Sequence, residues 1–197
     1  MDKPDNISEI EKILGYHFFE SQHLIRALTH PAFAHEQIQK NTVCLDQEAY
    51  STLGDAVIKT GLILFLMEKG IQTKGAITQA KETLEDNPNL VKVGRRLKIR
   101  KFILLGRGEK DLWRTGEEAI LADTVEALIG AIFLDSDASF GVVKQVIGQW
   151  FEPDLKRVHK KKPVEKDMVM PVIHPTVSSR REPPSQARRR SQRPLRR

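Results

Sequence analysis

Cysteine is almost missing from this 197-residue chain, since Cys44 is the only one. A single thiol excludes a disulfide framework within the chain and fits a reducing compartment. The six histidines are scattered along the sequence and form no zinc-ligand spacing with one another or with Cys44. We therefore expect a cytoplasmic protein, and any metal that it binds is expected to use oxygen ligands.

Long hydrophobic segments are also missing. The most apolar stretch, GLILFLM from Gly61 to Met67, is far shorter than the roughly 20 residues needed to cross a bilayer. The N-terminus, MDKPDNISEI, is polar and acidic, which excludes a secretory signal peptide. The sequence thus predicts a soluble protein with no membrane partner.

Aromatic residues are absent from the C-terminal part of the chain. Residues 154–197 contain no Phe, Tyr or Trp, and they carry 14 Lys and Arg against 4 Asp and Glu. Residues 1–153 carry 18 basic against 22 acidic residues. We therefore predict a domain over residues 1–153 and a disordered, Pro/Arg-rich basic tail over residues 154–197. A flexible basic arm indicates a polyanionic partner, most often nucleic acid, although a solubilising or targeting tail has the same composition.

Helix signals dominate residues 1–153, where no internal repeat and no series of alternating strands is visible. Ser8 and Glu11 have the spacing of a capping box. Asn87 precedes Pro88 as an N-cap precedes a first helical residue, and Gly70 is placed to end a long helix. The body is therefore predicted to be all-α, with helices over residues 8–14, 21–28, 46–70, 76–84, 87–97, 117–134 and 140–151.

Three carboxylates interrupt the apolar stretches of two predicted helices. Asp123 and Glu126 stand three residues apart in ILADTVEALIG, which places both on one helix face. Asp55 lies among apolar neighbours in STLGDAVIKTG, directly after Gly54, which leaves room for a close approach. Burying an unpaired carboxylate costs several kcal/mol, so these acids indicate either a metal site or structural ion pairs. The expected metal is Mg²⁺ or Mn²⁺, because both ions prefer carboxylate and water oxygens.

The chain resembles the ribonuclease III family over about residues 7–153. GEEAILADTVEALIGAIFLDSD, preceded by LLGRGE, is similar to a C-terminal helix motif of that family, and LGYHFFESQHLIRALTHPAFAHE is similar to its N-terminal helix pair. LEDNPNL resembles the asparagine-capped turn before a further helix. The resemblance implies an all-α endonuclease domain that acts on double-stranded RNA and is usually a homodimer with an RNA-holding valley. No second, folded RNA-binding domain is expected in the tail.

The family's signature helix departs from its usual form in this sequence. Where the family reads Glu-Arg-Leu-Glu-Phe-Leu-Gly-Asp, this chain reads EAYSTLGD. The resemblance assigns the family's four metal-binding acids to Ser51, Asp55, Asp123 and Glu126, so one of the four is a serine here. Thr52 takes the place of a phenylalanine that helps to form the family's dimer. A further family acid corresponds to Lys74.

The resemblance implies metal-dependent hydrolysis of duplex RNA that leaves 5′-phosphate and 3′-hydroxyl ends. Asp55 and Glu126 are the expected catalytic residues, and Asp123 joins them as a metal ligand. Glu48 and Lys74 are candidates for RNA contacts, although each also reads as an ordinary exposed side chain. Arg188, Arg189 and Arg190 in the tail are expected to neutralise RNA phosphates without reading sequence.

Two alternatives to a nuclease remain open. The first is a non-catalytic RNA-binding or ribosome-assembly protein on the same fold, which the loss of the acid at Ser51 favours. The second is a helical, metal-dependent hydrolase of small phosphorylated compounds, which the basic tail disfavours. The basic stretch VGRRLKIRK, from Val93 to Lys101, is read either as an RNA-facing ridge or as a solvated helix face.

Overall fold

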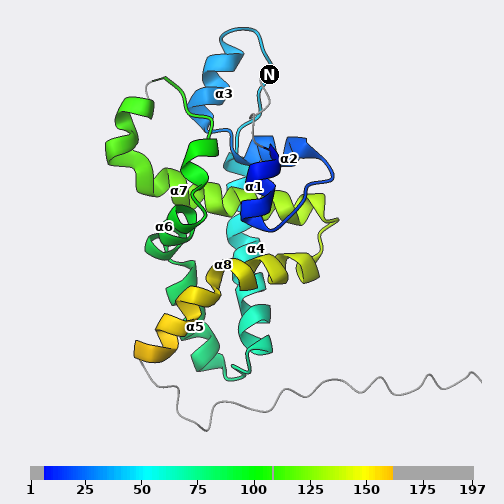
Figure 1. The fold of residues 1–197 in the computed structure, drawn as a ribbon, viewed down its shortest axis with the longest axis vertical. Helices are drawn as coiled ribbons and strands as arrows, with labels where there is room; N and C mark the ends of the chain where they lie inside the picture. The colour runs from blue at the N-terminus through cyan, green and yellow to red at the C-terminus, as the bar shows by residue number, and fades with distance from the viewer. Residues whose placement is uncertain (1–6, 108, 162–197) are drawn as a thin grey trace, which may run out of the picture.

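A computed structural model of the chain describes residues 7–107 and 109–161. Within these residues the chain forms helices and no strand, apart from an isolated bridge between Thr29 and Leu104. The all-α prediction is therefore confirmed. The helices, shown in Figure 1, are α1 (Ile7–Leu14), α2 (Ser21–Ala27), α3 (Pro31–Ile38), α4 (Glu48–Glu68), α5 (Lys74–Glu85), α6 (Asn87–Arg96), the 3-10 helix η1 (Ile99–Phe102), α7 (Glu109–Asp135) and α8 (Phe140–Lys161).

The two long helices α4 and α7 cross at the centre of the molecule and make the most extensive contact in it. α4 runs along the long axis of Figure 1 and α7 runs across it. Two glycines permit the close crossing, since a Cβ on Gly54 would lie 1.8 Å from the backbone oxygen of Glu126, and one on Gly130 would lie 2.2 Å from that of Tyr50. α2 and α6 pack on α7, while α5 and α8 pack on α4.

Several helix ends follow from the sequence signals, with small shifts. Gly70 has a φ of 86° just after the end of α4, as the predicted glycine cap requires. α6 begins where expected, but its N-cap is Asp86, whose carboxylate accepts the Asn89 backbone N–H, and Asn87 is already helical. Pro31 lies four residues after the end of α2 and begins a separate helix, α3, that was not among the predicted helices.

The predicted capping box at the first helix is wrong. Ser8 lies inside α1, and the buried Glu11 carboxylate turns toward the chain that follows the helix. It accepts the backbone N–H of Phe18 at 3.0 Å and lies 2.8 Å from the ring nitrogen Nδ1 of His17. Glu11 therefore fixes the α1–α2 connection and does not cap α1.

The folded part extends beyond the predicted boundary at residue 153. α8 continues through Pro153 to Lys161, and Asp154 and Leu155 are both buried. Arg96 on α6 donates to the Asp154 carboxylate at 2.7 Å, so the residues after Pro153 belong to the packed domain. The remaining predicted tail, with Arg188, Arg189 and Arg190, lies outside the described residues.

One described helix, α4, is long and apolar enough by length and composition alone to cross a membrane. Its buried side chains, among them Val57, Leu62, Phe65 and Leu66, belong to the hydrophobic core. Packing against α5, α7 and α8 accounts for the apolar composition of this helix.

Candidate metal-binding and catalytic site

The candidate site is built where α4 and α7 cross. Because Gly54 has no side chain, the α4 backbone comes against the backbone of Glu126. This contact brings two residues of α4 next to Glu126: Ser51, three residues before Gly54, and Asp55, directly after it. Three of the four positions that the resemblance assigns to metal binding thus meet at one helix crossing, and Asp123 lies one turn earlier on α7.

Glu126 is the most perturbed acid of the site. Its side chain is partly buried, and the Ser51 hydroxyl donates to Oε2 at 2.9 Å. The pKa of Glu126 is raised from 4.5 to about 7, chiefly by burial and in smaller part by the negative charges of Asp55 and Asp123, while the Ser51 hydrogen bond and Lys59 oppose the rise. Near neutral pH this carboxyl group is therefore divided between its acid and its carboxylate forms.

Asp55 has a cationic partner on its own helix. Lys59 donates from Nζ to Oδ2 of Asp55 at 2.6 Å, with the i,i+4 spacing that brings two side chains together on a helix surface. The hydrogen bond to Asp55 is the main reason why the pKa of Lys59 is raised. Both side chains are about half exposed, so this pair contributes less than about 1 kcal/mol to stability.

Asp123 lies on the solvent-facing side of α7 and is linked electrostatically with the start of α4. Partial desolvation raises its pKa, the charge of Glu48 adds to the rise, and His30 opposes it. Glu48 is the first residue of α4 and is exposed. The predicted RNA-contacting Glu48 therefore stands on the Asp123 side of the site.

The acids are suited to a divalent cation but do not form a closed cluster. Among the described residues, no three His, Cys, Asp or Glu side chains converge closely enough to constitute a finished metal site. Asp123 and Glu126 both have raised pKa values because nearby negative charge and desolvation are not fully compensated. A cation would relieve both effects, and carboxylate oxygens are the donors that Mg²⁺ and Mn²⁺ prefer.

The structure does not bring Lys74 to these acids. Lys74 begins α5, beyond the far end of α4. From Asp55 to Glu68 the α4 axis rises about 20 Å at 1.5 Å per residue. Lys74 is exposed, so within one copy of the chain its role as an RNA contact stays a prediction.

Two charged residues near the site were missed by the sequence analysis. Lys59 was detectable, because it stands four residues after Asp55 on the same predicted helix. Glu85 lies near Lys59, since its charge contributes to the raised pKa of that lysine. One Glu85 oxygen is bound by Lys81 at 2.7 Å, and the other has no partner among the described residues. No sequence signal placed Glu85 here, because its position depends on how α5 packs back along α4.

Comparison with known proteins identifies the class of this helical site. The model of a family described as ribonuclease-III-like matches residues 20–155, and the chain belongs to that family. The predicted resemblance is thereby confirmed, and so is the assignment of the fold.

Individual relatives agree with the family model. The ribonuclease 3 of Syntrophobacter fumaroxidans is 30% identical over 170 residues, which cover 85% of this chain and 69% of that protein. The ribonuclease 3 of Francisella tularensis is 35% identical over 153 residues, which cover 77% of this chain and 61% of that protein. This chain therefore spans between three fifths and seven tenths of the length of these two relatives.

A solved structure agrees as well. The nuclease domain of ribonuclease III from Campylobacter jejuni matches with a TM-score of 0.61 and 28% identity, over 81% of this chain and 100% of that one. That structure is described as flexible in a region involved in dimer formation. The fold of this chain is thus that of a ribonuclease III nuclease domain.

Proposed function

We propose that this protein is an endoribonuclease that hydrolyses phosphodiester bonds of double-stranded RNA and leaves 5′-phosphate and 3′-hydroxyl ends. The observation that carries the proposal is the meeting of Asp55 and Glu126 at the Gly54 crossing, in a chain of the ribonuclease-III-like family. The pKa of Glu126, at about 7, suits a group that binds and releases a proton near neutral pH.

Asp55, Asp123 and Glu126 would together hold Mg²⁺ or Mn²⁺. A divalent ion at these acids would supply a water of lowered pKa and neutralise charge on the phosphate. Ser51 donates its hydroxyl to Glu126 and thereby orients that carboxyl group. Lys59, which is paired with Asp55, provides positive charge at the same acids and would have to share them with the ion.

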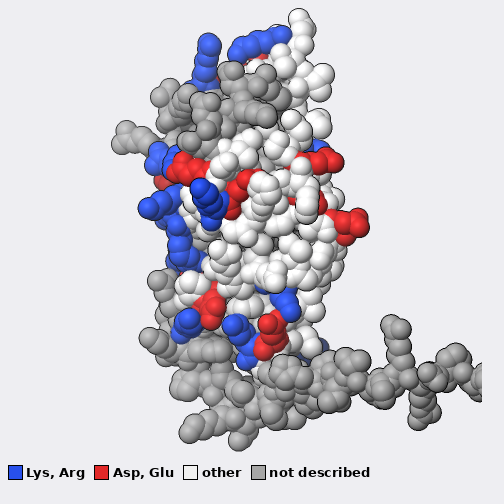
Figure 2. All heavy atoms as spheres, turned by 45° about the vertical axis from the view of Figure 1, so that its right-hand side comes forward, with Lys and Arg blue, Asp and Glu red and all other residues white. Residues whose placement is uncertain are grey.

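The RNA-binding surface and the dimer are part of the same proposal. Glu48 would lie at the margin of the site, and the arginines of the tail would add affinity that is independent of sequence. The face of the molecule in Figure 2 has a broad surface without charged side chains between acidic and basic margins, which suits contact with a second copy. Thr52 is exposed and donates to the Glu48 backbone oxygen, so it leaves the position of the family's phenylalanine without a large apolar group.

The test is cleavage of a long, end-labelled RNA duplex in Mg²⁺ and in Mn²⁺. We expect metal-dependent products from the wild type, none from Glu126→Gln, and faster cutting at low metal concentration by Ser51→Glu. Glu82→Gln, which changes an exposed acid on α5, is the matched control and should cut like the wild type. Metal-dependent cutting that survives in Glu126→Gln would contradict the assignment of this site.

A second function, binding of duplex RNA without cleavage, is favoured by one observation. The described acids form no ready three-ligand cluster, and two of them already have other partners, Lys59 at Asp55 and Ser51 at Glu126. In that case RNA would remain intact with all variants, and its affinity would not depend on Mg²⁺. The cleavage experiment therefore separates the two functions directly.

A further inference from the structure

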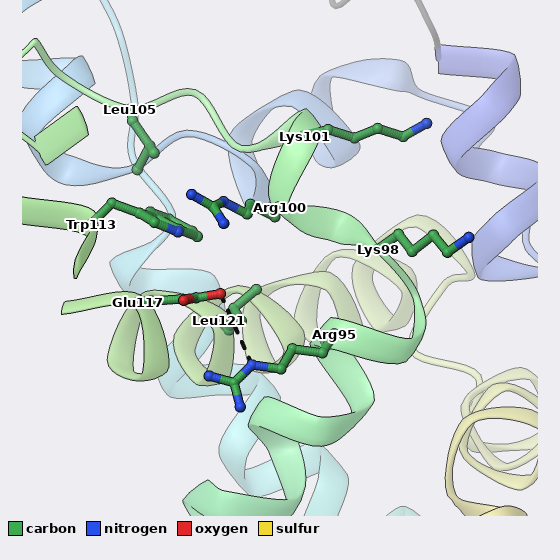
Figure 3. A pocket seen from close by; sticks show the side chains of 9 residues that line it. Arg95, Lys98, Arg100, Lys101, Leu105, Trp113, Glu117 and Leu121 are labelled. Atoms are coloured by element: carbon green, nitrogen blue, oxygen red, sulfur yellow. Dashed lines mark ion pairs between the residues drawn. The ribbon is translucent and has the colours of Figure 1, made fainter. Parts of the chain in front are cut away.

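A pocket lies on the other side of α7 from the acid site. It is a pocket of about 580 Å³ between the end of α6, the helix η1 and the first half of α7, and this volume is typical of small-molecule sites. Four of its nine lining residues are basic, and one is a tryptophan. The lining residues, shown in Figure 3, are Gly94, Arg95, Lys98, Arg100, Lys101, Leu105, Trp113, Glu117 and Leu121.

The pocket carries positive charge that the acidic side chains described by the structure do not fully neutralise. Arg95 has acidic partners, since Glu118 lies 3.3 Å from it and Glu117 3.9 Å, and Lys101 is paired with an acid of α1. Lys98 and Arg100, by contrast, have no carboxylate partner among the side chains that the structure describes. Two cations that line one pocket without counter-charges indicate a site for an anion.

A flat wall closes one end of the pocket. The Arg100 guanidinium lies over the Trp113 indole, 4.6 Å from the ring centroid. Trp113 is only 5% exposed, and its Nε1–H has no acceptor in the part of the chain that the structure describes. The exposed Arg100 guanidinium, backed by the indole, is a surface on which a nucleobase stacks, and an unused indole N–H is a donor for a polar ligand atom.

The charged end of the pocket differs from this flat end. In Figure 3, Arg100 reaches toward Trp113, while Lys98 and Lys101 extend away from Trp113 toward the opposite side. Lys98 also has a φ of 53°, a left-handed conformation that is unfavourable for a residue with a Cβ. A strained lysine without a counter-charge is the kind of feature that is found at binding sites. The pocket thus has a planar end and an ammonium end.

We propose that this pocket binds one nucleoside monophosphate unit, with the base against the Arg100–Trp113 wall and the phosphate at Lys98. Two sources share this chemistry, a free mononucleotide and an unpaired nucleotide at the end of an RNA strand. The second source rests on the proposed function, because it assumes an RNA substrate. Since stacking accepts every base, purine and pyrimidine nucleotides bind with similar affinity.

Calorimetric titration of the full chain with AMP and with UMP tests the proposal in metal-free buffer, where nuclease activity is irrelevant. AMP and UMP are expected to bind, and inorganic phosphate and adenosine to bind at least about tenfold more weakly, because each supplies only half of the recognised unit. Lys98→Gln and Arg100→Gln should each weaken AMP binding by about tenfold. Lys92→Gln, which removes an exposed cation of α6 outside the pocket, should leave it unchanged.

Circular dichroism and the thermal midpoint show whether each variant is folded. Trp113→Phe is an independent variant that keeps an aromatic ring beside Arg100 but removes the indole N–H donor. The proposal is overturned if AMP does not bind, if phosphate binds as tightly as AMP, or if Lys92→Gln weakens binding as much as Lys98→Gln.

A competition experiment then identifies the source of the nucleotide, in which AMP is displaced by a blunt RNA duplex or by a duplex with an unpaired overhang. Displacement of AMP by the overhang duplex alone supports an unpaired nucleotide of an RNA strand as the ligand. Displacement by neither the overhang duplex nor the blunt duplex supports the free mononucleotide. Equal displacement by a blunt duplex would show that the pocket holds duplex phosphates, and would also overturn the proposal.

Discussion

Replacing Glu126 by glutamine should stabilise the metal-free protein. The Glu126 pKa is raised to about 7 in the folded chain, from 4.5 in the absence of the fold. Between these two pH values the folded state binds more protons than the unfolded state. The free energy of unfolding therefore falls as the pH rises through this window, and the loss is complete above pH 7. Glutamine keeps an oxygen that accepts from Ser51 but has no charge to desolvate.

The size of the effect follows from the same pKa values. A change from 4.5 to about 7 is equivalent to about 3 kcal/mol, since each pKa unit is worth about 1.4 kcal/mol. Glu126 is only partly buried, so solvent and side-chain movement reduce the observable effect, and we expect a gain of about 1–2 kcal/mol for Glu126→Gln at pH 8. Asp123 also has a raised pKa, so some pH dependence of the same sign should remain in the variant.

The assay is urea unfolding in EDTA at pH 5 and at pH 8. At pH 5 wild type and Glu126→Gln should differ little, and at pH 8 the variant should be the more stable. Addition of Mg²⁺ should then stabilise the wild type, by about 2.7 kcal/mol at a hundredfold excess over its Kd, and should have less effect on the variant. A variant that is less stable than the wild type at pH 8 in EDTA would refute the argument that this carboxylate is uncompensated.

Three further outcomes follow from the packing and charge of the chain. Gly54→Ala should destabilise the protein by about 3 kcal/mol in urea unfolding, because its Cβ would lie 1.8 Å from a backbone oxygen, whereas Gly75→Ala, with open space around it, should not. Arg96→Met should lower the free energy of unfolding by about 2 kcal/mol in the same assay, since it removes the guanidinium that binds the buried Asp154 carboxylate, and a loss below about 1 kcal/mol would contradict this account. Deletion of residues 180–197 should weaken binding of duplex RNA at low salt and flatten the salt dependence, and an unchanged slope would show that the tail does not neutralise phosphates.

The helical architecture was readable from the sequence because its signals are local. Apolar periodicity, Pro88 after Asn87 and the glycine at position 70 each act within one or two turns of a helix. The errors occurred where a local signal had a competing tertiary use. Glu11 has capping-box spacing but is used to hold the α1–α2 connection. Asp154 looked like the first residue of a charged tail, yet the ion pair with Arg96 on α6 carries α8 past that point.

The candidate site was partly readable for the same reason. Asp123 and Glu126 are neighbours on one helix, and their spacing alone placed them together. Their relation to Asp55 depends on the crossing of two helices, and Gly54 was the only local sign of that contact. Glu85 and the basic pocket beside Trp113 depend on the packing of α5, α6 and α7, so their side chains come together only in the folded chain.

The serine at position 51 changes how the site balances its charge. A second glutamate there would face Glu126 at hydrogen-bond distance, where two carboxylates repel each other unless a cation or a shared proton lies between them. Ser51 instead donates a hydrogen bond that lowers the pKa of Glu126, and Lys59 lowers it as well. These two groups let the acids tolerate the metal-free state, but they also reduce the electrostatic gain from binding a divalent ion. Under the proposed function, the chain would therefore exchange metal affinity for stability without metal, and the metal concentration dependence of cleavage would be more informative about Ser51 than the rate at saturating metal.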